Sequence, residues 1–151
     1  MDQTSICNGC FASDTMISME GFTETRVDEI KIGDNIIGDN SSNIMTVVKV
    51  WKNTEERSCI RFEANLFNIL VTENHPMITD KGIKKAVDVT EKDMLLTELG
   101  YIAITSIGRE EYSGQVYNLE LTERGKTEDT DKATMRANGF VVGDYKVQEK
   151  L

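Results

Sequence analysis

A cysteine and the only histidine of this 151-residue chain are the residues best suited to covalent chemistry. Cys10 follows Gly9, and His75 stands in the segment TENHP, residues 72–76. A thiolate is an effective nucleophile, and an imidazole with an ordinary pKa of about 6.5 can carry a proton at neutral pH. The two side chains restrict the possible chemistries to a few, provided that the fold brings them together.

Short apolar segments rich in β-branched residues predict that the main elements are strands. Examples are residues 44–48, 58–62, 68–71 and 115–121, and the last of these alternates with period two, as a half-buried strand does. No window longer than about ten residues keeps a helical period. Gly-Asp, Asp-Asn and Asn-Gly pairs separate the segments and favour turns. The sequence therefore predicts an all-β domain with one or two short helical turns.

The chain also contains an internal duplication. Residues 16–22 resemble 77–83, residues 27–37 resemble 86–96, and residues 46–48 resemble 105–107. Three matches in the same order predict a pseudo-twofold fold with a duplicated β unit. Equivalent positions then face each other across the symmetry axis. Since Cys10 lies just upstream of the first copy and His75 begins the second, the duplication gives the two residues a reason to meet.

Composition excludes several classes of function. The chain has 17 Lys and Arg against 26 Asp and Glu, a net charge of −9, which argues against binding to nucleic acid or to an anionic membrane surface. No segment approaches the roughly 18 apolar residues that span a bilayer, and no secretory leader is visible. Three cysteines are an odd number, which favours thiols in a reducing, cytoplasmic compartment over a disulfide scaffold.

The motifs around these residues resemble the Hint domain, the fold of inteins, bacterial intein-like domains and the hedgehog autoprocessing module. The similar motifs are residues 10–15, the Gly33-Asp34 turn, the T-x-x-H motif at residues 72–75, and residues 116–121 and 137–142. The resemblance is strongest to bacterial intein-like domains. It implies a horseshoe-like Hint fold over residues 10–144, with residues 1–9 and 145–151 as upstream and downstream flanks.

The resemblance also implies a chemistry for these residues. Cys10 would attack the Gly9 carbonyl and convert the Gly9–Cys10 amide into a thioester. Thr72 would form a hydrogen bond at the same peptide, and His75 would protonate the departing nitrogen. The domain would act once, on its own flanking segments, with water, a thiol or an amine as the acyl acceptor. A monomer without a cofactor is expected.

The C-terminal end departs from the pattern. Inteins usually close with His-Asn followed by Cys, Ser or Thr, whereas this chain has Gly143, Asp144 and Tyr145. Asp144 would be the reacting residue, but an aspartate cyclises mainly when its carboxyl is protonated, and Gly143 supplies no proton donor. Asn118 stands where many relatives have Asp, and Ala133 where many have a second His. We therefore expect that C-terminal cleavage at Asp144–Tyr145 is weak and that complete splicing is disfavoured.

Alternative interpretations stay open. Cys7, Cys10, Cys59 and His75 are residue types that could bind zinc as a Cys₃His set. A Cys7–Cys10 disulfide would block the nucleophile and make processing dependent on redox conditions. The chain could also be a degenerate Hint-like domain with a purely structural role. A cysteine hydrolase acting on other molecules has the least support, since there is no second histidine.

Overall fold

The computed structural model describes residues 9–55, 58–125, 133–149 and 151. Strands dominate this part of the chain, so the all-β prediction is confirmed. The elements are β1 (Phe11–Ala12), β2 (Met16–Ser18), β3 (Glu24–Arg26), the 3-10 turn η1 (Val27–Glu29), β4 (Asn35–Ile37), β5 (Ile44–Glu55), β6 (Ser58–Ala64), β7 (Phe67–Val71), β8 (Pro76–Thr79), β9 (Gly82–Lys85), the 3-10 turn η2 (Ala86–Asp88), β10 (Met94–Thr97), β11 (Gly100–Ala103), β12 (Ser106–Glu111), β13 (Gly114–Glu123), β14 (Thr134–Ala137), β15 (Phe140–Gly143) and helix α1 (Tyr145–Glu149). Among these residues no helix has the length and apolar character needed to cross a bilayer.

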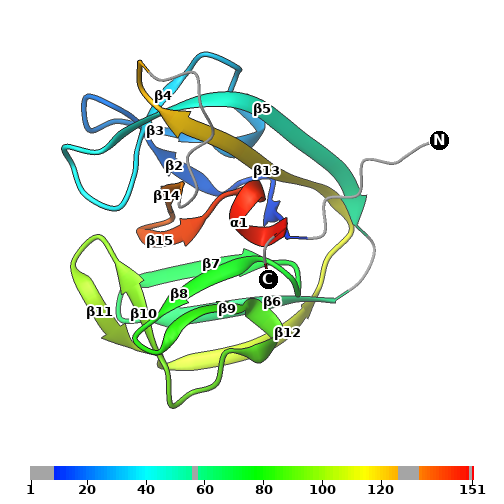
Figure 1. Ribbon diagram of the computed structural model, residues 1–151. Helices are drawn as coiled ribbons and strands as arrows, with labels where there is room; N and C mark the ends of the chain where they lie inside the picture. The colour runs from blue at the N-terminus through cyan, green and yellow to red at the C-terminus, as the bar shows by residue number, and fades with distance from the viewer. Residues whose placement is uncertain (1–8, 56–57, 126–132, 150) are drawn as a thin grey trace.

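The strands form two antiparallel sheets. Their orders are β12-β6-β7-β1-β13-β5-β4 and β11-β10-β8-β15-β14-β2-β3, and β9 pairs with β8 in the second sheet. Figure 1 shows the long ribbons of β5 and β13 running side by side, as their ten paired residues require. Because β13 also pairs with β1, a strand from the end of the chain lies directly beside the start of the domain.

The predicted half-buried alternation is present in the first part of β13, from exposed Gln115 to buried Asn118, but the centre of the strand is buried on both faces. Val116 packs with Cys10 in a small cluster, and Leu119 points into the main core. Asn118 lies on the same face as Val116, because side chains two residues apart share a face, and it is also fully buried. β1 and β5 pair with the two edges of β13, and side-chain clusters cover its two faces, which residue alternation alone does not reveal.

The predicted duplication is present in the hydrogen bonds. The Val27 N–H donates to the Thr15 carbonyl at 2.7 Å, and the Ala86 N–H donates to the His75 carbonyl at 2.9 Å. Val27 begins η1 directly after the β2–β3 hairpin, and Ala86 begins η2 directly after the β8–β9 hairpin. Thr15 and His75 therefore occupy equivalent positions in the two copies of the unit.

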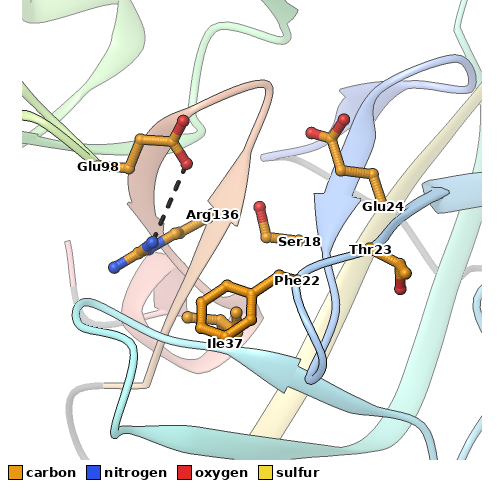
Figure 2. Close-up of a pocket in the computed structure, with 7 residues that line it drawn as sticks. All are labelled: Ser18, Phe22, Thr23, Glu24, Ile37, Glu98 and Arg136. Atoms are coloured by element: carbon orange, nitrogen blue, oxygen red, sulfur yellow. Dashed lines mark ion pairs between the residues drawn. The ribbon is translucent and has the colours of Figure 1, made fainter.

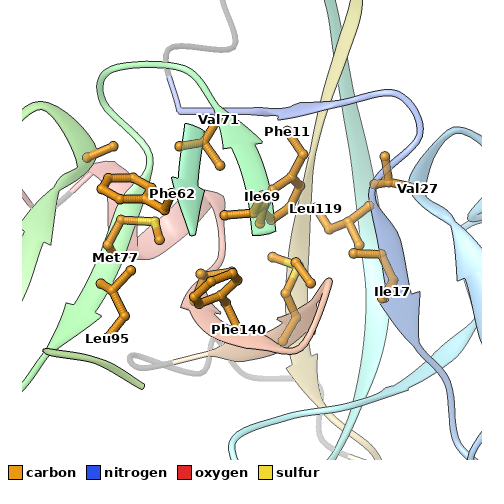
Figure 3. Close-up of a cluster of buried hydrophobic side chains, with 14 of the residues drawn as sticks. Phe11, Ile17, Val27, Phe62, Ile69, Val71, Met77, Leu95, Leu119 and Phe140 are labelled. Carbon is orange, nitrogen blue, oxygen red and sulfur yellow. The ribbon is translucent and has the colours of Figure 1, made fainter. Parts of the chain in front are cut away.

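Both copies contribute to one hydrophobic core. Figure 3 shows Phe11, Ile17 and Val27 near the start of the chain in the same cluster as Phe62, Met77, Leu95 and Phe140. These side chains are almost completely shielded from water, and burial of each large one stabilises the fold by roughly 1.5–3 kcal/mol. The shared core holds the two copies as a single unit and fixes the strands next to Cys10 and His75.

Gly139 occupies a hairpin turn that leaves no space for a side chain. Asn138 and Gly139 have φ values of 50° and 88°, and a Cβ at Gly139 would lie 2.3 Å from Cδ1 of Phe67. Gly139→Ala is therefore expected to lower the free energy of unfolding by about 2–4 kcal/mol through backbone strain and overpacking. The control Gly82→Ala, at φ 112° with open space around it, should cost only about 1–2 kcal/mol. Urea unfolding measures both, and equal costs would contradict the steric explanation.

Candidate functional site

The peptide bond between Gly9 and Cys10 is buried, and both of its polar atoms are hydrogen-bonded to side chains. The Cys10 N–H donates to Oγ1 of Thr72 at 2.8 Å. The carbonyl oxygen of Gly9 accepts a hydrogen bond from Nδ2 of Asn118. One peptide bond is thus held between the loop that follows β7 and the centre of β13.

The loop at residues 72–75, between β7 and β8, positions Thr72 and His75. The Thr72 N–H donates to the Cys10 carbonyl at 2.9 Å, and the His75 N–H donates to the Thr72 carbonyl at 3.2 Å. Pro76 begins β8 and favours an extended backbone at His75, because the proline ring clashes with a helical conformation there. Thr72 therefore binds Cys10 through both its backbone and its hydroxyl.

The side chain of His75 is fully buried beside this peptide. Its ring contacts the ring of Phe11, with centroids 4.3 Å apart at an angle of 44°. Neither ring nitrogen has a hydrogen bond of normal geometry within the described residues. Burial lowers the pKa of His75 from 6.5 to about 4, although the nearby backbone of Gly9 and Gly143 acts to raise it. The imidazole is therefore neutral at pH 7, whereas an imidazole with the ordinary pKa would be partly protonated.

Asp144 is also fully buried, but its carboxylate binds backbone groups of neighbouring elements. Its Oδ2 accepts the Leu121 N–H at 2.8 Å, and its Oδ1 accepts the Val147 N–H at 3.1 Å. The bond to Val147 is the N-cap bond of α1, three residues on. Burial raises the pKa of Asp144 to about 6, against the lowering effect of these two N–H groups. Both carboxylate oxygens are thus engaged in holding β13 and α1.

The segment after Asp144 packs against the domain. The ring of Tyr145 stacks on Trp51 with centroids 4.1 Å apart, and Val147 is buried. Helix α1 contacts both β13 and β15, as Figure 1 shows at the centre of the view. A Cβ at Gly143 would lie 2.8 Å from Cγ1 of Val147, so a histidine at position 143 would not fit while α1 stays in place. The sequence pattern missed this helix because it is five residues long.

The other cysteines bear on the alternatives. Cys59, on β6, packs with Ala12 and Leu70 in a cluster separate from that of Cys10. Among the residues with described positions, no group of three or more His, Cys, Asp or Glu side chains could hold a metal ion. The Cys10 sulfur is disulfide-bonded, so a thiol forms there only after reduction. Cys7 lies outside the described residues, so the Cys7–Cys10 pair and the four-residue zinc set stay predictions.

Two further features bear on the candidate site: the position of Ala133 and the pocket drawn in Figure 2. Ala133 is fully buried, and its carbonyl accepts the Asp144 N–H at 3.1 Å. The pocket has a volume of about 270 Å³, and Figure 2 shows Arg136 pointing toward Glu98 across an ion pair of 3.9 Å. None of the four candidate residues predicted from the sequence lines this pocket.

Comparison with known proteins identifies the fold. No protein-family model matches the chain, and neither does any curated protein sequence. Solved structures do match: the gp41-1 intein has a TM-score of 0.73 at 14% identity, covering 90% of this chain and 98% of that one. A bacterial intein-like domain from Clostridium thermocellum has a TM-score of 0.73 at 21% identity, covering 89% of this chain and 98% of that one. The chain has the Hint fold. A DnaB intein from Synechocystis sp. agrees, with a TM-score of 0.72 at 18% identity and coverage of 90% and 98%.

Within the Hint fold, three of the four candidate residues lie together. Cys10, Thr72 and His75 surround the Gly9–Cys10 bond, whereas the carboxylate of Asp144 binds β13 and α1. Asn118, which the sequence grouped with the altered residues of the C-terminal half, instead donates a hydrogen bond to the Gly9 carbonyl. Only the pairing of β1 with β13 reveals that Asn118 reaches Gly9.

Proposed function

We propose that the chain is a self-processing domain that cleaves its own Gly9–Cys10 bond through a thioester. The proposal rests on one observation: side chains bind both polar atoms of this peptide bond, and a histidine ring lies beside it. Thr72 accepts its N–H, Asn118 donates to its carbonyl, and the neutral ring of His75 lies beside it. The similar structures are named as inteins and as a bacterial intein-like domain, which supports the same class of activity.

The chemistry starts once a thiol reductant has released the Cys10 sulfur. As Sγ attacks the carbonyl carbon of Gly9, the neutral imidazole of His75 takes the thiol proton. A carbon–sulfur bond forms, and the carbonyl electrons move onto the oxygen. The intermediate collapses when the carbon–nitrogen bond breaks, and His75 returns the proton to the nitrogen, which becomes the α-amino group of Cys10. Water, a thiol or an amine then consumes the thioester.

The buried position of His75 favours the second half of this proton transfer. Because its pKa is lowered to about 4, the imidazolium that forms is a stronger acid than ordinary histidine and returns its proton readily to the departing nitrogen. Thr72 keeps that nitrogen in place through the 2.8 Å hydrogen bond. Holding the sulfur and the carbonyl within one chain can contribute roughly 7–11 kcal/mol of the barrier when they are well aligned.

Intact-mass measurement of the purified chain, with and without dithiothreitol at neutral pH, tests the proposal. The reduced chain is expected to break at Gly9–Cys10, and Cys10→Ala is expected to stay whole. Cys59→Ala is the matched control, because Cys59 is also a buried cysteine but lies in another cluster, and it should cleave normally. A reduced wild-type chain that stays whole would contradict the proposal and favour a purely structural role.

On the C-terminal side, we propose that the Asp144–Tyr145 bond stays intact. Asp144→Asn is expected to release no C-terminal segment at neutral pH, although asparagine is the residue that cyclises. The physical reasons are that the amide oxygen of asparagine can keep the N-cap bond to the Val147 N–H, and that Gly143 offers no proton donor. Mass spectrometry of the incubated variant checks this result. Loss of residues 145–151 would show that the capped helix does not protect the bond.

A further inference from the structure

We propose that Asn118 is a catalytic residue whose side-chain amide stabilises the negative charge that develops on the Gly9 oxygen. The inference rests on the proposed function, because this oxyanion exists only when the Cys10 sulfur attacks Gly9. Its basis is the contact between the Asn118 amide and the carbonyl that would be attacked.

The orientation of the Asn118 amide is determined by two hydrogen bonds. Its Nδ2 donates to the Gly9 oxygen, while its Oδ1 accepts the N–H of Leu119 at 2.8 Å. Since a backbone N–H is always a donor, the amide oxygen must face Leu119 and the amide nitrogen must face Gly9. The donor therefore points at the carbonyl before any reaction begins.

The strand that carries Asn118 is rigidly supported. Asn118 lies opposite Trp51 of β5, and Val116, two residues earlier, lies opposite Ala12 of β1. Because β1 directly follows Cys10, the same pairing that fixes Asn118 also fixes the scissile peptide. A donor held in place by two neighbouring strands needs no reorganisation when charge appears, which is the condition for effective electrostatic catalysis.

The burial of the site makes this donor selective for the transition state. The Gly9 oxygen carries only a partial charge in the amide but a full negative charge in the tetrahedral intermediate. Hydrogen bonds to charged acceptors are roughly twice as strong as those to neutral ones. Asn118 and Cys10 are both fully shielded from water, so solvent does not weaken the difference. The Asn118 amide donates a hydrogen bond throughout and neither gains nor loses a proton.

Asn118→Asp gives a test with a distinctive signature, because it exchanges the donor for an acceptor of nearly the same shape. At pH 7.5 the carboxylate should repel the developing oxyanion and slow thiol-induced cleavage by about 100- to 1000-fold relative to wild type. In acid the protonated carboxyl can donate to the Gly9 oxygen, so the ratio to wild type should recover at least about 10-fold by pH 5. The other buried titratable groups around the site, Cys10, His75 and Asp144, are common to both proteins and cancel in this ratio.

Asn118→Ala is the companion variant, since it removes the donor without adding a charge. It is expected to cleave slowly at every pH, with no recovery in acid. If Asn118→Asp does not fold, the rate of Asn118→Ala still tests the role of the amide donor. A merely structural role would give the two variants the same pH profile. Wild-type rates in both variants, or no recovery in a folded Asn118→Asp, would overturn the assignment of Asn118 and leave the proposed function standing. A wild-type chain that does not cleave would instead overturn the proposed function itself.

Discussion

Replacing His75 with glutamine is expected to slow thiol-induced cleavage at Gly9–Cys10 by at least about 100-fold, the usual contribution of a positioned acid–base group. His75 is the only histidine in the sequence, and its ring lies beside the backbone of Gly9. Glutamine keeps a polar side chain of similar size but cannot accept and return a proton. Single-turnover rates, taken at thiol concentrations where the rate no longer depends on the thiol, measure the effect.

The pH profile of the wild-type chain provides a second readout for His75. Because burial lowers the pKa of His75 to about 4, the neutral imidazole persists throughout the range from pH 7 to pH 5. The cleavage rate should therefore show no histidine transition near pH 6.5 and should fall only as the pH approaches 4. A transition near pH 6.5, or a wild-type rate for His75→Gln, would contradict the proton-transfer role of His75.

The second large effect concerns the free energy of unfolding, which His75 and Asp144 make depend on pH in opposite directions. The pKa of His75 is lowered from 6.5 to about 4, so the unfolded chain binds the proton more tightly. The stability associated with neutral His75 is complete above about pH 6.5 and is lost as the pH falls toward 4. A shift of this size corresponds to roughly 3 kcal/mol in the free energy of unfolding.

Asp144 acts in the opposite direction over nearly the same range. Its pKa is raised from 3.8 to about 6, so the folded chain binds the proton more tightly than the unfolded chain. The stability associated with protonated Asp144 is complete below about pH 4 and is lost as the pH rises through 6. This contribution is also roughly 3 kcal/mol, so the two groups largely cancel between pH 4 and pH 6 in the wild-type protein.

Single substitutions should separate the contributions of His75 and Asp144 to the pH dependence of stability, which largely cancel in the wild-type protein. Relative to wild type, Asp144→Asn is expected to lose about 3 kcal/mol of unfolding free energy when the pH is lowered from 6.5 to 4, because it lacks the stability that wild type gains as Asp144 is protonated. His75→Gln should gain a similar amount over the same range. Urea unfolding at several pH values measures both differences, and every other titrating group cancels in the comparison with wild type. Parallel profiles for the two variants would contradict the assigned pKa shifts.

Much of the fold could be predicted because the sequence repeats itself. The match between residues 27–37 and 86–96 reflects two equivalent turns, η1 and η2, which bind the carbonyls of Thr15 and His75 in the same way. A local pattern of this kind survives in the sequence because each copy forms its own hairpin and turn. The proximity of Thr72 and His75 could also be predicted, because both residues lie in one short loop.

The contacts that depend on distant pairing could not be predicted. Asn118 reaches Gly9 because β13 lies beside β1, although 109 residues separate the two partners. The capping role of Asp144 requires α1, which is too short to give a helical pattern and has Val147 as a buried anchor. The low pKa of His75 follows from complete burial, which residue identity alone does not convey.

Trapping the acyl group with hydroxylamine would detect the Gly9–Cys10 thioester itself. The chain is first reduced and then incubated with hydroxylamine at neutral pH, and the products are sequenced by tandem mass spectrometry. We expect a released segment that ends in a hydroxamate on Gly9, together with a fragment that begins at Cys10 with a new α-amino group. The same treatment of Cys10→Ala should leave the chain whole. An intact reduced wild-type chain, or a break that leaves no hydroxamate on Gly9, would contradict the thioester at this bond.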